Sequence, residues 1–244
     1  MTAPPLRAVL WDFDGTLVDT RARNLSVNRR IVEEISGRSW REFAVLRSQA
    51  AYDAAQRTAV NWREFYRGNC TFTDLEIDRA GSCWAPYQTQ DPTPAPLING
   101  VVEALGSLDG LPTGIVSQND RETIESVLRA HGLGRRFGCI VGYAEVAMSR
   151  QKPSADSLLL GLERLTGLQP GRALYVGDHP TDIACVDNAN RALEARGLGL
   201  WVLSVAALWG SPERDPDWAA TADHRAATPN EVVELVGRLA RDQG

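Results

Sequence analysis

The sequence is poor in cysteine and lacks the cysteine spacings that mark a disulfide framework or a zinc site. Its 244 residues contain four cysteines, and no two of them form a CxxC pair. They are Cys70, Cys83, Cys139 and Cys185. Scattered cysteines of this kind are typical of reduced thiols, so we expect a cytoplasmic protein.

Long apolar runs and a strong charge of either sign are also missing. No run of about 18 apolar residues is present, which excludes a helix that spans a bilayer. The N-terminal segment lacks the basic-then-apolar layout of a secretory signal. The chain has 26 basic and 31 acidic residues, for a formal charge of −5. Because this mild acidity attracts neither nucleic acids nor anionic membranes, we expect neither as a partner.

What remains is ordinary globular composition, with 43% hydrophobic and 23% charged residues, which argues against a disordered chain. Short apolar runs recur, and several end in small, polar or acidic residues. These runs cover residues 6–11, 113–116, 139–141, 173–176 and 198–205. Helix-like stretches lie between them, at 122–130, 154–166 and 187–195. Apolar runs alternating with helices predict an α/β fold with a doubly wound, Rossmann-like parallel sheet. Ligands of such sheets bind at the carboxyl ends of the strands.

The region from about residue 24 to residue 84 has a different character. Its apolar residues recur at helical spacing and it contains few strand-like runs, which predicts a set of inserted helices. A segment with three prolines, residues 91–96, follows and indicates a stiff extended connector. We therefore expect a core domain made of residues 1–19 and 97–244, and a helical domain made of residues 20–96.

Acidic residues gather after two of the predicted strands. Asp12 and Asp14 follow the first strand, and Asp178 and Asp182 follow the fourth. Carboxylates this close repel one another unless a cation lies between them or one of them is protonated. If the two strands are neighbours, up to four carboxylates converge, and Mg²⁺ is the hard cation that suits such oxygen ligands.

A metal surrounded by carboxylates would attract a phosphate ester, and one carboxylate could attack its phosphorus atom. Ser117 offers a hydroxyl, the backbone N–H groups of Gln118 and Asn119 are further donors, and the helix that follows favours phosphate at its N-terminus. Lys152 supplies a compact positive charge. Simpler interpretations remain open: Ser117 and Asp182 as helix caps, and Lys152 as a surface charge.

Four segments in order along the chain carry a resemblance. The stretch Asp12-Phe13-Asp14-Gly15-Thr16-Leu17-Val18-Asp19-Thr20 resembles the first motif of the haloacid dehalogenase-like (HAD) hydrolase superfamily. Ser117 is similar to its second motif, Lys152-Pro153 to its third, and Gly177-Asp178 through Asp182 to its fourth. The helical insert lies where the members with a cap domain after the first motif have it, and the phosphoglycolate-phosphatase-like branch is the most similar.

The resemblance implies a role for each of these residues. Asp12 would be the nucleophile and Asp14 the general acid and base. Mg²⁺ would be held by Asp12, the backbone carbonyl of Asp14 and Asp178, with Asp182 in support. Ser117 and Lys152 would bind the phosphoryl group, with Gln118 and Asn119 beside them. Gly15 would let the backbone pass close to the phosphate, because it has no Cβ.

The implied function is a Mg²⁺-dependent phosphatase that hydrolyses a small phosphorylated metabolite through an aspartyl-phosphate. Two alternatives stay open: a phosphomutase of the same superfamily, and a phosphate-binding regulator without turnover. The segment 187–199 departs from the usual pattern after the fourth motif, and the loop 211–218 is irregular. The sequence indicates neither the physiological substrate, nor the oligomeric state, nor the cap residues that set specificity.

Overall fold

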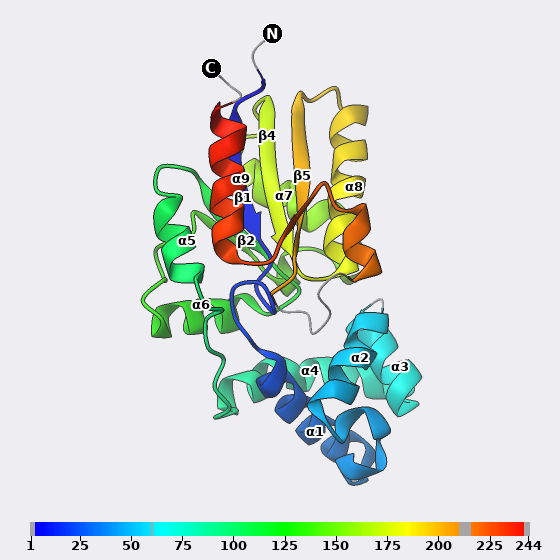
Figure 1. Ribbon diagram of the computed structural model, residues 1–244. Helices are drawn as coiled ribbons and strands as arrows, with labels where there is room; N and C mark the ends of the chain where they lie inside the picture. Colours follow the sequence, from blue (N-terminus) through cyan, green and yellow to red (C-terminus); the bar gives the residue numbers. More distant parts are fainter. Residues whose placement is uncertain (1–2, 60, 210–215, 242–244) are drawn as a thin grey trace. The chain divides into compact units, whose positions relative to one another are not determined.

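The computed structural model describes residues 3–59, 61–209 and 216–241. Most of the irregular loop 211–218, namely residues 211–215, lies outside these ranges. The chain forms two compact units. Unit 1 comprises Met1–Asp19 and Leu97–Gly244, and unit 2 comprises Thr20–Pro96 (Figure 1). Each unit has its own hydrophobic core.

Unit 1 is built on a six-stranded sheet with the order β3-β2-β1-β4-β5-β6, in which all neighbouring strands are parallel. The strands are β1 (Leu6–Trp11), β2 (Thr113–Val116), β3 (Cys139–Val141), β4 (Gly171–Gly177), β5 (Leu200–Ala207) and β6 (His224–Ala226). In the central register Leu10 lies between Gly114 of β2 and Tyr175 of β4. The predicted α/β fold with a parallel, Rossmann-like sheet is confirmed, and this strand order is the one common to that fold.

Helices cover the sheet of unit 1. They are α5 (Val101–Ser107), α6 (Arg121–Ala130), α7 (Asp156–Thr166), α8 (Pro180–Ala195) and α9 (Pro229–Arg241), with short 3-10 helices at Tyr143–Glu145, Met148–Arg150 and Asp217–Thr221. Helix α7 contacts β1, β2 and β3, while α8 contacts β4 and β5. Helix α9 contacts α5, β1 and β6, and Figure 1 shows it in front of the strands that α7 lies behind.

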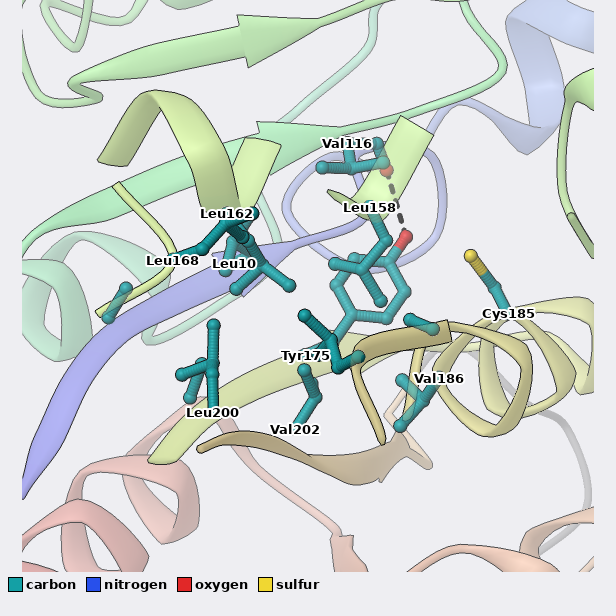
Figure 2. Packing of buried hydrophobic residues seen from close by; sticks show 14 of the residues in the cluster. Leu10, Val116, Leu158, Leu162, Leu168, Tyr175, Cys185, Val186, Leu200 and Val202 are labelled. Carbon is teal, nitrogen blue, oxygen red and sulfur yellow. Dashed lines mark hydrogen bonds between the residues drawn. The ribbon is translucent and has the colours of Figure 1, made fainter. Parts of the chain in front are cut away.

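The core between the sheet and helices α7 and α8 is apolar and tightly closed (Figure 2). Leu10, Leu158, Leu162 and Val202 are fully buried there. Burying one such side chain stabilises a fold by about 1.5–3 kcal/mol. Tyr175 lies among them, and its hydroxyl is directed at the backbone carbonyl of Val116, 2.9 Å away. The core therefore reaches up to the carboxyl ends of β2 and β4.

Two features of unit 1 differ from the sequence prediction. The strand β6 and helix α9, near the C-terminal end, were not predicted. Helix α8 begins at Pro180, whereas the helix-like stretch was expected at 187–195 and the cap interpretation of Asp182 placed a helix start near Ile183. Pro180 is well suited to a first helical position, and His179 precedes it as N-cap, with its ring nitrogen accepting from the Thr181 N–H.

Unit 2 is helical throughout its described elements, as the inserted segment predicted. Its elements are α1 (Arg21–Ser36), the 3-10 helices Trp40–Glu42 and Ala44–Leu46, α2 (Gln49–Thr58), α3 (Trp62–Cys70) and α4 (Asp74–Gln90). Side chains of Ser48, Asn61 and Thr73 cap the N-termini of α2, α3 and α4. The buried residues Ile31 and Ile35 of α1 follow helical spacing and pack into the core of this unit.

The chain leaves and re-enters unit 1 at adjacent points. Val18 forms an antiparallel bridge with Leu97, and the Ile98 N–H donates to the Leu17 carbonyl at 2.9 Å. A 77-residue insertion is therefore compatible with an undisturbed sheet, because its two ends meet. All four cysteines are free. Across the described ranges, no helix combines the length and apolar character that crossing a membrane requires.

Candidate active site

Polar side chains meet at the carboxyl ends of three neighbouring strands. Asp12 follows β1, Ser117 follows β2 and Asp178 follows β4. Because β1 lies between β2 and β4 in a parallel sheet, residues separated by more than 100 positions reach one edge. This edge is where the strand order changes direction, the usual ligand site of such sheets.

Lys152 lies buried between two carboxylates, those of Asp12 and Asp182. Its Nζ is 2.7 Å from Asp12 Oδ1 and 2.8 Å from Asp182 Oδ1, and the residue is 5% exposed. Burial alone would lower the pKa of this ammonium, but Asp12 and Asp182 outweigh burial and raise the pKa above its ordinary value. The interpretation of Lys152 as a solvated surface charge is therefore wrong.

Asp182 is held from several sides. Its Oδ1 accepts from Lys152 and lies 3.1 Å from the Tyr175 hydroxyl, while its Oδ2 accepts from the His179 N–H at 3.1 Å. Asp182 is thus part of the capping box of α8 and also the partner of Lys152. The helix-cap interpretation is correct but incomplete, because the same carboxylate also holds the lysine.

Three carboxylates are arranged as a group that could hold a metal ion. Asp12, Asp178 and Asp182 each offer an oxygen within 4.8 Å of the others. Burial raises the pKa of Asp12 from 3.8 to about 7; Lys152 opposes this rise, and Asp182 and Asp14 add to it. Burial, followed by the charges of Asp12 and Asp182, also holds the pKa of Asp178 well above its usual range. A hard divalent cation binds oxygen ligands and would neutralise carboxylates that have too little positive charge nearby. The three carboxylates therefore fit such an ion.

Asp14 lies beside these groups and is held by an amide. The Asn119 Nδ2 donates to both carboxylate oxygens, at 3.2 and 3.0 Å. The Asn119 N–H, which we expected to face a phosphate, donates to Ser117 Oγ at 3.1 Å. The side chain of Gln118 donates to the Lys152 carbonyl at 3.0 Å. Asn119 therefore links the residues that follow β2 to Asp14. Sequence reasoning named both residues but missed this contact.

The helix after Ser117 is capped by another residue. Asp120 is the N-cap of α6, and its Oδ1 accepts from the N–H groups of Glu122 and Thr123 at 2.9 and 3.3 Å. The interpretation of Ser117 as the cap of this helix is therefore wrong. The expectation of a phosphate at this N-terminus also needs correction, because the N–H groups of Glu122 and Thr123 already donate to the Asp120 carboxylate.

Two glycines allow the carboxylates to approach the backbone. Gly15 has a φ of +75°, and a Cβ at this position would lie 2.1 Å from Asp178 Oδ2. A Cβ on Gly177 would lie 2.3 Å from Asp182 Oδ2. Thr16, a residue of the first motif to which the resemblance gave no role, brings its hydroxyl within 3.3 Å of Asp178 Oδ1. The backbone is thus packed directly against the carboxylates of Asp178 and Asp182, and a side chain at either glycine would displace them.

Lys152, which the motifs already indicate, is also marked by a second signal in the sequence. Of the 26 basic residues, 25 are arginine and Lys152 is the only lysine. A lone lysine in so arginine-rich a chain suggests a position where a compact ammonium is needed and a planar guanidinium does not fit. Tyr175 could not be found in this way, because within an apolar strand it is indistinguishable from a core residue.

Known proteins with similar sequences indicate the family to which this chain belongs. The sequence pattern of the haloacid dehalogenase-like hydrolases matches residues 9–193. A phosphoglycolate phosphatase of Synechococcus elongatus is 27% identical over 241 residues, which is 97% of this chain and 100% of that protein. An N-acetylmuramic acid 6-phosphate phosphatase of Pseudomonas aeruginosa is 25% identical over 97% of both chains.

Solved structures agree with this comparison. A HAD-superfamily hydrolase of subfamily IA, variant 1, from Geobacter sulfurreducens is 25% identical, with a TM-score of 0.62 over 97% of this chain and 99% of that chain. A structure from Lactobacillus plantarum has a TM-score of 0.73 at 23% identity, over 96% of this chain and 100% of that chain. This second likeness shows the fold.

Proposed function

This chain belongs to the haloacid dehalogenase-like hydrolase family and is a phosphoric monoester hydrolase, and we propose that it is a Mg²⁺-dependent phosphatase acting on a small phosphomonoester through an aspartyl-phosphate on Asp12. The observation that carries the proposal is the buried group in which Lys152 Nζ holds Asp12 Oδ1 at 2.7 Å, at the carboxyl end of the sheet. A carboxylate fixed by one oxygen presents the other in a defined direction, as a nucleophile requires.

The proposed reaction has two halves. In the first, an oxygen of Asp12 forms a bond to phosphorus, the bond from phosphorus to the ester oxygen breaks, and Asp14 gives a proton to the leaving alkoxide. In the second, Asp14 takes a proton from water, the water oxygen bonds to phosphorus, and Asp12 leaves as a carboxylate with inorganic phosphate as product. The Asn119 amide, which contacts both Asp14 oxygens, would hold this carboxyl group in place for both transfers.

We assign the metal site to Asp12, Asp178 and the backbone carbonyl of Asp14. When bound, Mg²⁺ would neutralise the negative charge of the acidic group and attract the anionic phosphate to the site. Asp182 would support the site mainly through Lys152, because its oxygens already accept from Lys152 Nζ and the His179 N–H. Lys152 and Ser117 would contact the phosphoryl group, with the N–H of Gln118 and the backbone at Gly15 and Asn119 beside it.

The names of two relatives support a proposal for the substrate class. The Synechococcus relative is named for phosphoglycolate and the Pseudomonas relative for a sugar-acid 6-phosphate. We therefore propose a small phosphorylated carboxylic acid or sugar acid as the substrate. Unit 2 would serve as the cap domain that selects it. This choice is tested by comparing phosphoglycolate with a neutral phosphomonoester of similar size; equal kcat/KM values would contradict it.

The nucleophile assignment is tested with Asp12→Asn, which keeps the shape of the side chain. We expect Mg²⁺-dependent phosphate release from p-nitrophenyl phosphate to fall on the order of 10³-fold or more, because an amide cannot form the phosphoenzyme. Asp187→Asn, at an exposed position of α8, is the matched control and should retain full activity. Unchanged release by Asp12→Asn would overturn the proposal.

A further inference from the structure

The backbone that carries Lys152 is held by an unusual series of contacts. Three consecutive carbonyls, those of Lys152, Pro153 and Ser154, each accept a hydrogen bond from a side chain. Gln118 Nε2 donates to the first at 3.0 Å, Asn188 Nδ2 to the second at 2.9 Å, and Cys185 Sγ to the third at 3.1 Å. This segment precedes α7, so its carbonyls are outside any helix or strand and need such partners.

Helix α8 supplies most of these contacts from residues spaced three apart. Asp182 accepts from the Lys152 ammonium, Cys185 donates to Ser154, and Asn188 donates to Pro153. Residues three apart on a helix are neighbours along its surface. One rigid helix therefore holds Lys152 at both ends, the ammonium through Asp182 and the backbone through Asn188.

The orientation of the Asn188 amide is set by its other contact. Arg191 Nη1 donates to Asn188 Oδ1 at 2.8 Å, so the carbonyl oxygen faces the guanidinium and the NH₂ group faces Pro153. The reverse orientation would bring two donors together on one side and two acceptors together on the other. Both residues belong to the segment 187–199 that departs from the usual family pattern, so the motifs assign them no role.

We propose that Asn188 is a positioning residue for catalysis, which fixes the Lys152–Pro153 backbone so that the ammonium is held against Asp12. This inference rests on the proposed function only in the test that measures turnover. Loss of the amide leaves the Pro153 carbonyl unpaired and lets the segment shift. A displacement of about 1 Å at a catalytic group can lower turnover by up to about 100-fold.

The first test is a double-mutant cycle with Lys152→Ala, measured as kcat on p-nitrophenyl phosphate. We expect Asn188→Ala to lower kcat about tenfold in the wild-type background and less than about twofold in the Lys152→Ala background. Asp187→Ala, the exposed neighbour on α8, should change kcat in neither background. Equal losses in the two backgrounds would indicate a general structural role and overturn the proposal.

The second test does not depend on turnover. Because Lys152 is the only lysine, a protein labelled with ¹⁵N-lysine has one side-chain ammonium signal. We expect this signal to exchange slowly with water in the wild type and in Asp187→Ala, and to be lost to fast exchange in Asn188→Ala. A slow signal in Asn188→Ala overturns the proposal even if the protein proves to have no phosphatase activity. If the three proteins show the expected exchange rates but the wild type releases no phosphate, the proposed function is overturned and the positioning role of Asn188 stands.

Discussion

At the scale of single residues, the site is governed by an imbalance of charge. The carboxylates of Asp12, Asp14, Asp178 and Asp182 influence one another, and the ammonium of Lys152, which contacts Asp12 and Asp182, offsets one of the four negative charges. Buried carboxylates in such surroundings take up protons more readily than in water. The pKa values of Asp12 and Asp178 are accordingly raised, and this makes the stability of the metal-free protein depend on pH.

The sign of this dependence follows from Asp12. Its pKa is about 7 in the fold against 3.8 in the unfolded chain, so between these values the folded state binds more protons. Stability must then fall as the pH rises through this window, by at most about 1.4 kcal/mol for each pKa unit. In EDTA we expect a lower melting temperature at about pH 8 than at about pH 5. Mg²⁺ should raise the melting temperature more at the higher pH, because it replaces the missing protons.

Asp12→Asn supplies the control for this prediction. The amide does not ionise, so the difference in melting temperature between the two pH values should shrink in the variant. Thermal denaturation followed by circular dichroism, with and without Mg²⁺, measures both effects. A pH difference as large in Asp12→Asn as in the wild type would contradict the assignment of the dependence to this carboxyl group.

How far these contacts could be foreseen depends on what determines them. Asp12 and Asp178 meet because they end neighbouring parallel strands, and that can be argued from strand pattern and topology. The pairing of Asn119 with Asp14 depends on the side-chain conformation of a loop residue, which no periodicity reports. The role of Tyr175 could not be predicted for a related reason, since its polar contacts depend on where its hydroxyl lies within the core.

At the scale of elements, the sheet has an open stretch that α8 closes. Strand β6 pairs with β5 from Val205 onward, so among the described residues no strand lies beside Val202 on that side. Asn190 takes the place of the missing strand: its Nδ2 donates to the Val202 carbonyl at 2.8 Å, and its Oδ1 accepts from the Val202 N–H at 2.9 Å. A buried amide here does the work of two ladder hydrogen bonds.

Asn190→Ala should therefore destabilise the protein. It leaves one buried donor and one buried acceptor unpaired, for which we expect a loss of roughly 2–3 kcal/mol in the free energy of unfolding. Asn230→Ala, at an exposed position of α9, should cost less than about 0.5 kcal/mol. Urea denaturation measures both. Equal stabilities of the two variants would show that water replaces the Asn190 amide and that α8 does not close this edge.

Sequence reasoning missed strand β6 and the start of helix α8 for different physical reasons. Strand β6 has three residues, His224, Arg225 and Ala226, and its order comes from pairing with β5 rather than from its own apolar character. The first turn of α8 holds Pro180 and the buried carboxylate of Asp182, which an apolar pattern does not report, so the helix begins before the point at which that pattern indicates it. At the start of α8, a residue needed for the site thus interrupts the pattern that predicts the helix.

At the scale of the whole molecule, each of the two compact units has a hydrophobic core of its own in the part of the chain that the structure describes. Unit 1 is centred on side chains such as Leu162 between sheet and helices, and unit 2 on side chains such as Ile31 and Phe65 between helices. The candidate metal ligands belong to unit 1 alone. A chain with two cores need not unfold in one two-state transition, and a ligand stabilises only the part that binds it.

Ile31→Ala tests this separation. The side chain is fully buried, and its removal should cost unit 2 about 2–5 kcal/mol without touching the candidate site. We expect calorimetry to resolve two thermal transitions in this variant, of which Mg²⁺ raises only the upper one. In Leu162→Ala, the matched variant in the core of unit 1, the transition that responds to Mg²⁺ should instead be the lowered one. A single transition that Mg²⁺ shifts equally in both variants would mean that the two cores unfold together.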